Sequence, residues 1–169
     1  MVLISCADFP HTYPWLDFSP PVTQSVALGP TTAVVYGRFA KEPGFAPGAE
    51  LGLRLCNQSS KHDYLIRFRD EESVYGIVIE PGNYKIAGYV ATFRDAIKVL
   101  RNSYSETRSF EVRPNTCTYL GNFIGHAQIA GANLGGAGII AITNNTVAIK
   151  KEFRQKYPNL ASASVVSPL

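Results

Sequence analysis

The fold of this chain is decided by one stretch, which reads VYGIVIEPGNYKIAGYVATF from Val74 to Phe93. Two runs of β-branched and aromatic residues, the types that fit a pleated sheet, flank a Pro-Gly-Asn triplet. Pro81 presets φ for a turn, Gly82 accepts a positive φ without steric cost, and Asn83 tolerates a bent backbone. The stretch therefore predicts a β-hairpin, and with it a sandwich or a barrel.

Further strand signals lie on both sides of this stretch. The segment 49–57 alternates with a period of two residues, which is the pattern of a strand buried on one side. Similar β-rich composition marks the segments 31–39, 64–68, 107–113, 116–123 and 139–143. About eight short strands predict an all-β fold, an antiparallel β-sandwich of immunoglobulin-like or prealbumin-like type.

Two segments interrupt the β rhythm. Residues 94–106 place Phe93, Ala96, Ile97 and Leu100 at helical spacing, which favours a short helix or an irregular excursion. Residues 129–138 carry four glycines, which favour a loop or a bulge between two strands.

The two ends of the chain differ from this β-rich middle. Residues 1–30 are rich in proline and aromatic residues, so we expect an extended arm that lays its rings on its own surface or on a partner's. Residues 146–157 read as a helix that Pro158 stops. One side of it carries Val147, either Ile149 or Lys150, Phe153 and Tyr157. We therefore divide the chain into the arm at 1–30, a β-sandwich at 31–145, and a C-terminal helix with its tail at 146–169.

Composition argues against two classes of partner. The 169 residues carry a net charge of +3, and the basic residues are scattered, which is atypical of a nucleic-acid-binding protein. No apolar run approaches the roughly 18 residues that a transmembrane helix requires.

The sequence presents no catalytic, cofactor or metal signature. His11, His62 and His126 share no metal-ligand spacing, and the glycines at 131–138 lack the ending of a phosphate-binding loop. No nucleophile elbow is present. We therefore predict a protein without catalytic, cofactor-binding or metal-binding residues, and not an enzyme.

The three cysteines allow two kinds of chemistry. Cys56 and Cys117 each lie in a predicted strand, where they form either a disulfide or two buried thiols. Leu3-Ile4-Ser5-Cys6 resembles a bacterial lipobox, in which the cysteine is lipidated, although the charged and most of the apolar parts of a signal peptide are missing.

Several motifs between residues 74 and 160 resemble those of small bacterial envelope lipoproteins. In that group a PG-x-Y turn is followed by F-x-V-x-P and T-Y-L-G strands and a YP-x-L close, and here the corresponding residues are 81–84, 110–114, 118–121 and 157–160. Related motifs occur in carboxypeptidase-regulatory-like and prealbumin-like sandwiches. The resemblance implies a β-sandwich without catalytic residues, located in the periplasm or outer membrane or secreted, and it supports lipidation at Cys6.

These observations lead to one preferred hypothesis and one alternative, with a third hypothesis of an enzyme whose residues are assembled from loops and include a buried His126 beside a carboxylate. We expect a structural or protein-binding subunit of an envelope or extracellular assembly, whose arm contacts protein partners through aromatic anchors, which dominate interface energy. The predicted partner-binding residues are Tyr13, Trp15, Leu16 and Phe18. The alternative is a small-ligand or carbohydrate binder with a pocket lined by Tyr75, Tyr89 or Tyr104.

Overall fold

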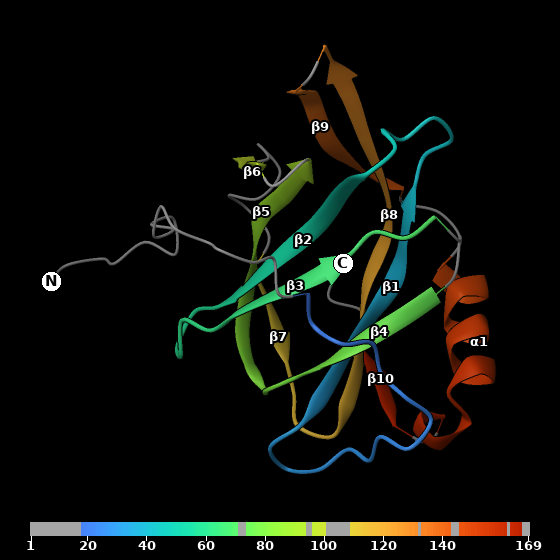
Figure 1. Ribbon diagram of the computed structural model, residues 1–169. Coiled ribbons are helices and arrows are strands. Elements are labelled where there is room, and N and C mark those ends of the chain that lie inside the picture. The colour runs from blue at the N-terminus through green and yellow to red at the C-terminus, as the bar shows by residue number, and fades with distance from the viewer. Residues whose placement is uncertain are drawn as a thin grey trace, which may run out of the picture.

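The computed structural model describes residues 18–70, 74–93, 96–100, 109–131, 133–142, 146–161 and 163–166. Two five-stranded sheets face each other, and a single described α-helix lies on the outside of one of them (Figure 1). The predicted β-sandwich is therefore confirmed.

The strands range from three residues in β10 to fifteen in β8, and β8 and β9 form a long hairpin. Their bounds are β1 Ala33–Lys41, β2 Ala49–Asn57, β3 Asp63–Arg67, β4 Val74–Ile79, β5 Gly82–Phe93, β6 Ala96–Leu100, β7 Ser109–Val112, β8 Thr116–Ala130, β9 Asn133–Ile142 and β10 Ser164–Val166. The helix α1 spans Thr146–Lys156, and a 3-10 turn follows at Pro158–Leu160.

The first sheet has the order β10-β8-β1-β4, and β9 also pairs with β8. Within it, β8 runs parallel to both β1 and β10, and the remaining pairs are antiparallel. The second sheet has the order β3-β2-β5-β6, with β7 also on β5, and all its pairs are antiparallel.

The main core fills the space between the sheets. Leu51, Leu53 and Leu55 of β2 all point into it, as the alternation of segment 49–57 predicts. Phe39 of β1 stacks on Phe123 of β8, with 5.5 Å between ring centroids. Burial of these apolar faces is the main source of stability in such a fold.

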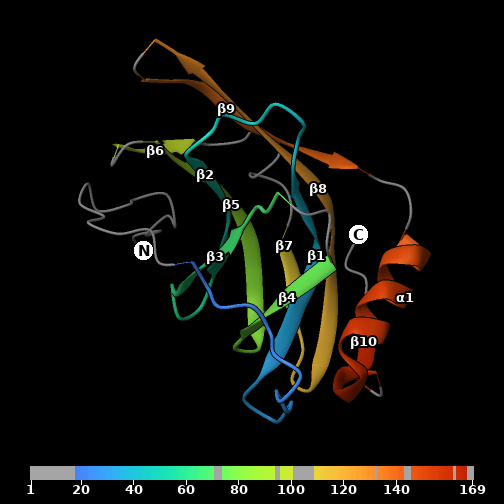
Figure 2. The ribbon, with the colours of Figure 1, turned by 45° about the vertical axis from the view of Figure 1, so that its right-hand side comes forward.

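A second core lies on the outer face of the first sheet, beneath α1. Ile149 and Phe153 point from the helix onto the sheet, and Phe153 stacks on Tyr36 with 3.9 Å between ring centroids. Figure 2 shows α1 beside the sheet on the side away from β2 and β5. Val147, predicted on the packed side, is instead 83% exposed, because the buried stripe follows Ile149, Phe153 and Tyr157 at a spacing of four residues.

The predicted hairpin at Pro81-Gly82-Asn83 is wrong. The strands on either side of the turn never pair with each other, since β4 pairs with β1 and β5 pairs with β2. The turn is an arch that carries the chain from one sheet to the other. The turn residues are suited to both structures, and the strand partners decide between them.

Two interruptions of the β rhythm are also strands. Residues 96–100, predicted as helix or irregular, form β6 on β5, because pairing with an existing strand outweighs a short local helical preference. The glycine-rich segment, predicted as a loop or bulge, forms most of β9, which pairs with β8 from Asn122 to Ala130. Gly138 permits this pairing, since a β-carbon there would lie 2.3 Å from the ring of His126.

The structure decides between the two predictions for Cys56 and Cys117. Both thiols are buried, and no disulfide joins the two residues. Cys56 lies on β2 and Cys117 lies on β8 in the core beneath α1, which places the two residues on different sheets.

Candidate interaction surface at the root of the arm

The first described residues of the arm lie on the body of the protein. We call residues 18–22 the arm root. The ring of Phe18 lies against β2 at Gly52, where a β-carbon would come within 2.7 Å of it. The guanidinium of Arg67 on β3 lies over the same ring, 4.8 Å from its centroid. The Phe18 ring thus packs between the backbone at Gly52, which has no side chain, and the guanidinium of Arg67.

Backbone hydrogen bonds carry the arm root from one sheet to the other. The Ser19 amide donates to the carbonyl of Leu65 on β3 at 2.9 Å, and the Leu65 amide donates to the Ser19 hydroxyl at 3.2 Å. Three residues later the Val22 amide donates to the carbonyl of Gly76 on β4 at 2.8 Å, and the Val22 side chain is buried. The root therefore joins the outer edges of β3 and β4, which would otherwise be open to pairing.

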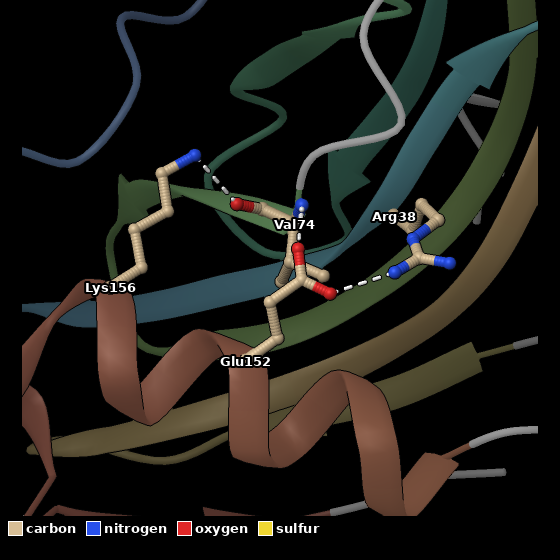
Figure 3. A network of polar contacts seen from close by, with 4 residues as sticks. All are labelled: Arg38, Val74, Glu152 and Lys156. Atoms are coloured by element: carbon tan, nitrogen blue, oxygen red, sulfur yellow. Dashed lines mark hydrogen bonds and ion pairs between the residues drawn. The ribbon is translucent and has the colours of Figure 1, made fainter.

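Side chains of α1 continue the protection of β4 beyond the arm root (Figure 3). Glu152 accepts a hydrogen bond from the Val74 amide at 3.1 Å and pairs with Arg38 at 2.7 Å. Lys156 donates to the Val74 carbonyl at 3.0 Å. Both backbone groups of Val74 are thereby satisfied by one helix.

A hollow of about 400 Å³ lies beside Phe18. It is lined by Lys41, Glu50, Arg67, Phe68, Arg69 and Asp70, and we call it the charged hollow. Its lining residues form two ion pairs, Arg67 with Glu50 at 3.0 Å and Lys41 with Asp70 at 3.3 Å.

Arg69 differs from the other two cations of the hollow. Its guanidinium lies over the ring of Tyr75, 4.5 Å from the centroid, and it makes no ion pair with a carboxylate among the described residues. Burial raises the pKa of Tyr75 above its ordinary value, so this phenol is neutral and does not neutralise Arg69. The hollow can therefore accept an anionic group beside Arg69.

Of the predicted partner-binding residues, only Phe18 falls within the described part of the chain. Tyr13, Trp15 and Leu16 lie outside it, as does Cys6 with the proposed lipidation site. Tyr75 and Tyr89, named for a ligand pocket, are buried in the main core, and Tyr104 lies outside the described residues.

The histidines that the structure describes do not share a site. His62 stacks on Tyr64, 4.5 Å between centroids, and the His126 ring lies beside Gly138. Within the described ranges, no group of three or more potential metal ligands forms, and no helix has the length and apolar character needed to cross a membrane.

The charged hollow was missed at the level of sequence, although one signal for the seat of Phe18 was available. A glycine inside a strand often marks a close approach of another group, and Gly52 interrupts the exposed side of an otherwise regular alternation. The charged residues of the hollow come from three separate segments, at positions 41, 50 and 67–70, which only the folded structure brings together.

Comparison with protein-family models, with curated proteins and with solved structures found no match for this chain. The function of these surfaces is therefore argued from their own geometry and chemistry.

Proposed function

We propose that this protein is a non-catalytic structural or protein-binding subunit of a bacterial envelope or extracellular assembly, and that its arm contacts the protein partner. One observation supports the proposal most directly: the arm root is hydrogen-bonded to both sheets. The chain that precedes it is therefore attached to the surface at a defined position. An anchored segment loses less conformational freedom on binding than a free tail, which favours affinity.

The charged hollow supports the same proposal and specifies the chemistry of the partner. It adjoins the seat of Phe18, because Arg67 both lines the hollow and covers the Phe18 ring. A partner that contacts the arm at Phe18 would meet Arg69 in the adjoining hollow. We therefore expect an acidic side chain of the partner to pair with Arg69.

The experiment is co-purification of partners from the envelope of the native bacterium, with the full chain as bait. We expect a variant with Tyr13→Ala and Trp15→Ala to lose the partner, because aromatic anchors supply most of the binding energy. Arg69→Gln should weaken capture and reduce its dependence on salt. The matched control is Arg113→Gln, an exposed arginine on the chain after β7.

The proposal fails if the Tyr13 and Trp15 variant retains every partner of the natural chain. The envelope location has a separate test, since it rests on the lipobox-like residues and on the resemblance to envelope lipoproteins. The intact mass of the natively expressed protein reports both cleavage before Cys6 and acylation of its thiol.

A further inference from the structure

Among the described residues, one edge of β9 has no strand partner. The strand pairs with β8 alone, and no described residue outside β8 forms a backbone–backbone hydrogen bond with it. One side chain reaches it, the Tyr89 hydroxyl, which donates to the Ala137 carbonyl at 2.8 Å. By contrast, the edge of β4 is covered by the arm root and by side chains of α1.

In sequence, this edge lacks two of the devices that prevent pairing with another strand. Proteins protect edge strands with charged residues, prolines or a covering segment. From Ala127 to Ile142 the sequence contains no charged residue and no proline. At about 3.4 Å per residue, β9 offers an edge on the order of 30 Å long.

Apolar side chains of the hairpin are also left open. Ile140 on β9 is 55% exposed and Ile129 on β8 is 40% exposed. Leu134 and Ala137 pack against the core beneath the hairpin but are only partly buried. Figures 1 and 2 show the far end of the β8–β9 hairpin extending beyond the body of the sandwich, where another chain can reach it.

We infer that β9 pairs with β9 of a second copy of this chain, in antiparallel orientation about a twofold axis. Two identical strands related by such an axis form a self-complementary contact, and backbone hydrogen bonds continue the sheet across it. Because β9 carries no charge, electrostatic complementarity selects no charged partner for it. The same lack of charge means that two copies of β9 do not repel each other.

The side chains of β9 suit this pairing. Ile140 and Gly136 lie on the same face, because both point to the side opposite Ala137 and Ile139. Space is open at Gly136, since a β-carbon there would have no neighbour within 4 Å. Pairing centred on Gly138 places Ile140 of each copy opposite Gly136 of the other, so that each exposed isoleucine fills the space left by a glycine.

The test is sedimentation equilibrium of the full chain and of single lysine variants. We expect a concentration-dependent dimer whose dissociation constant rises about tenfold or more in Ile140→Lys and in Gly136→Lys. The matched control is Val147→Lys, which makes a similar change at a more exposed site on α1. Circular dichroism verifies that each variant is folded, and Gly136→Lys serves as the second variant because a side chain fits there without a clash.

A monomer at all concentrations up to about 0.5 mM would overturn the inference. It would also be overturned if both edge variants dimerise like the natural chain, or if Val147→Lys weakens the dimer as much as they do. Amide hydrogen exchange gives an independent readout, since dimerisation should slow exchange in residues 133–142. Loss of partners in the Tyr13 and Trp15 variant should leave the dimer unchanged, so this inference and the proposed function can fail separately.

Discussion

The ring of Phe18 lies so close to Gly52 that a β-carbon on residue 52 would come within 2.7 Å of it. The arm and the outer face of β2 are therefore matched in shape: the ring needs a glycine beneath it. Ser19 and Val22 of the same segment are hydrogen-bonded to β3 and β4. Displacement of the Phe18 ring should therefore weaken these hydrogen bonds to both sheets.

Gly52→Val should release the arm root. The new side chain and the Phe18 ring require the same space, and overpacking of this kind costs about 1–3 kcal/mol of the free energy of unfolding. Limited proteolysis should cut near residue 18 faster than in the natural protein. Gly136→Val is the control, because that site has open space, and equal proteolysis of both variants would contradict the prediction.

Glu152→Ala should lower the free energy of unfolding by about 1–3 kcal/mol, because it leaves the Val74 amide and Arg38 without their acceptor. Urea unfolding measures the loss. The comparison variant is Glu111→Ala, whose pair with Arg113 is exposed on both sides and should contribute less than about 1 kcal/mol. Equal costs for the two variants would show that the contact between α1 and β4 contributes no more than a surface ion pair.

Gly82→Ala should be more destabilising than Gly44→Ala. Both glycines have positive φ, 155° at Gly82 and 86° at Gly44, so both substitutions strain the backbone. Only at Gly82 would the new β-carbon meet another group, the Asn57 amide nitrogen at 2.7 Å. We expect thermal unfolding to place the additional cost at about 1–2 kcal/mol, and no difference would mean that Asn57 yields freely.

Cys117→Val should make the stability of the protein less sensitive to alkaline pH. Burial raises the pKa of the Cys117 thiol from 9.0 to about 11, with Arg154 acting in the opposite direction. Between these values the unfolded chain has lost the thiol proton and the folded chain keeps it. Unfolding therefore releases a proton, and stability falls as pH rises from about 9 to 11, by up to about 1.4 kcal/mol per pH unit.

Urea unfolding at pH 7, 9 and 10 measures this slope. Buried Tyr36 and Tyr84 also have raised pKa values and contribute a slope of their own in both proteins. The difference between the natural chain and Cys117→Val reports the thiol together with its effect on the pKa of Tyr36. A difference in stability that stays constant across these pH values would contradict the prediction.

The sequence predicts the parts of this fold that depend on one strand and its own faces. The alternation in 49–57 identifies β2 with its bounds, because Leu51, Leu53 and Leu55 share the face toward the main core. The expected burial of one side only is wrong, since Arg54 and Cys56 on the other face are buried as well. The sequence does not predict which strands pair with each other. The residues Pro81-Gly82-Asn83 suit a hairpin and an arch equally well, and the outcome depends on β1 and β2, which lie 20 or more residues away.

The glycine-rich strand and the candidate surface show the same limit. Gly138 weakens β9 locally, but the paired β8 and the ring of His126 make the strand favourable. Aromatic content of the arm is visible in the sequence, whereas the seat of Phe18 requires β2 and β3 to lie side by side. Sequence reasoning finds the residues that make contacts more readily than the surfaces that receive them.

The parallel pairing of β8 has a consequence for the order of folding. β8 lies between β1, which enters the sheet some 80 residues earlier in the chain, and β10, which follows α1. A growing chain can therefore pair β1 with β4, but β1 lacks its second neighbour, β8, until most of the protein has been synthesised. Among the described residues, the edge of β8 beside Cys117 is covered by β10. Pairing across such long sequence separations slows folding. The parallel half of the first sheet, β1 with β8 and β8 with β10, should thus form after the antiparallel pair of β1 and β4.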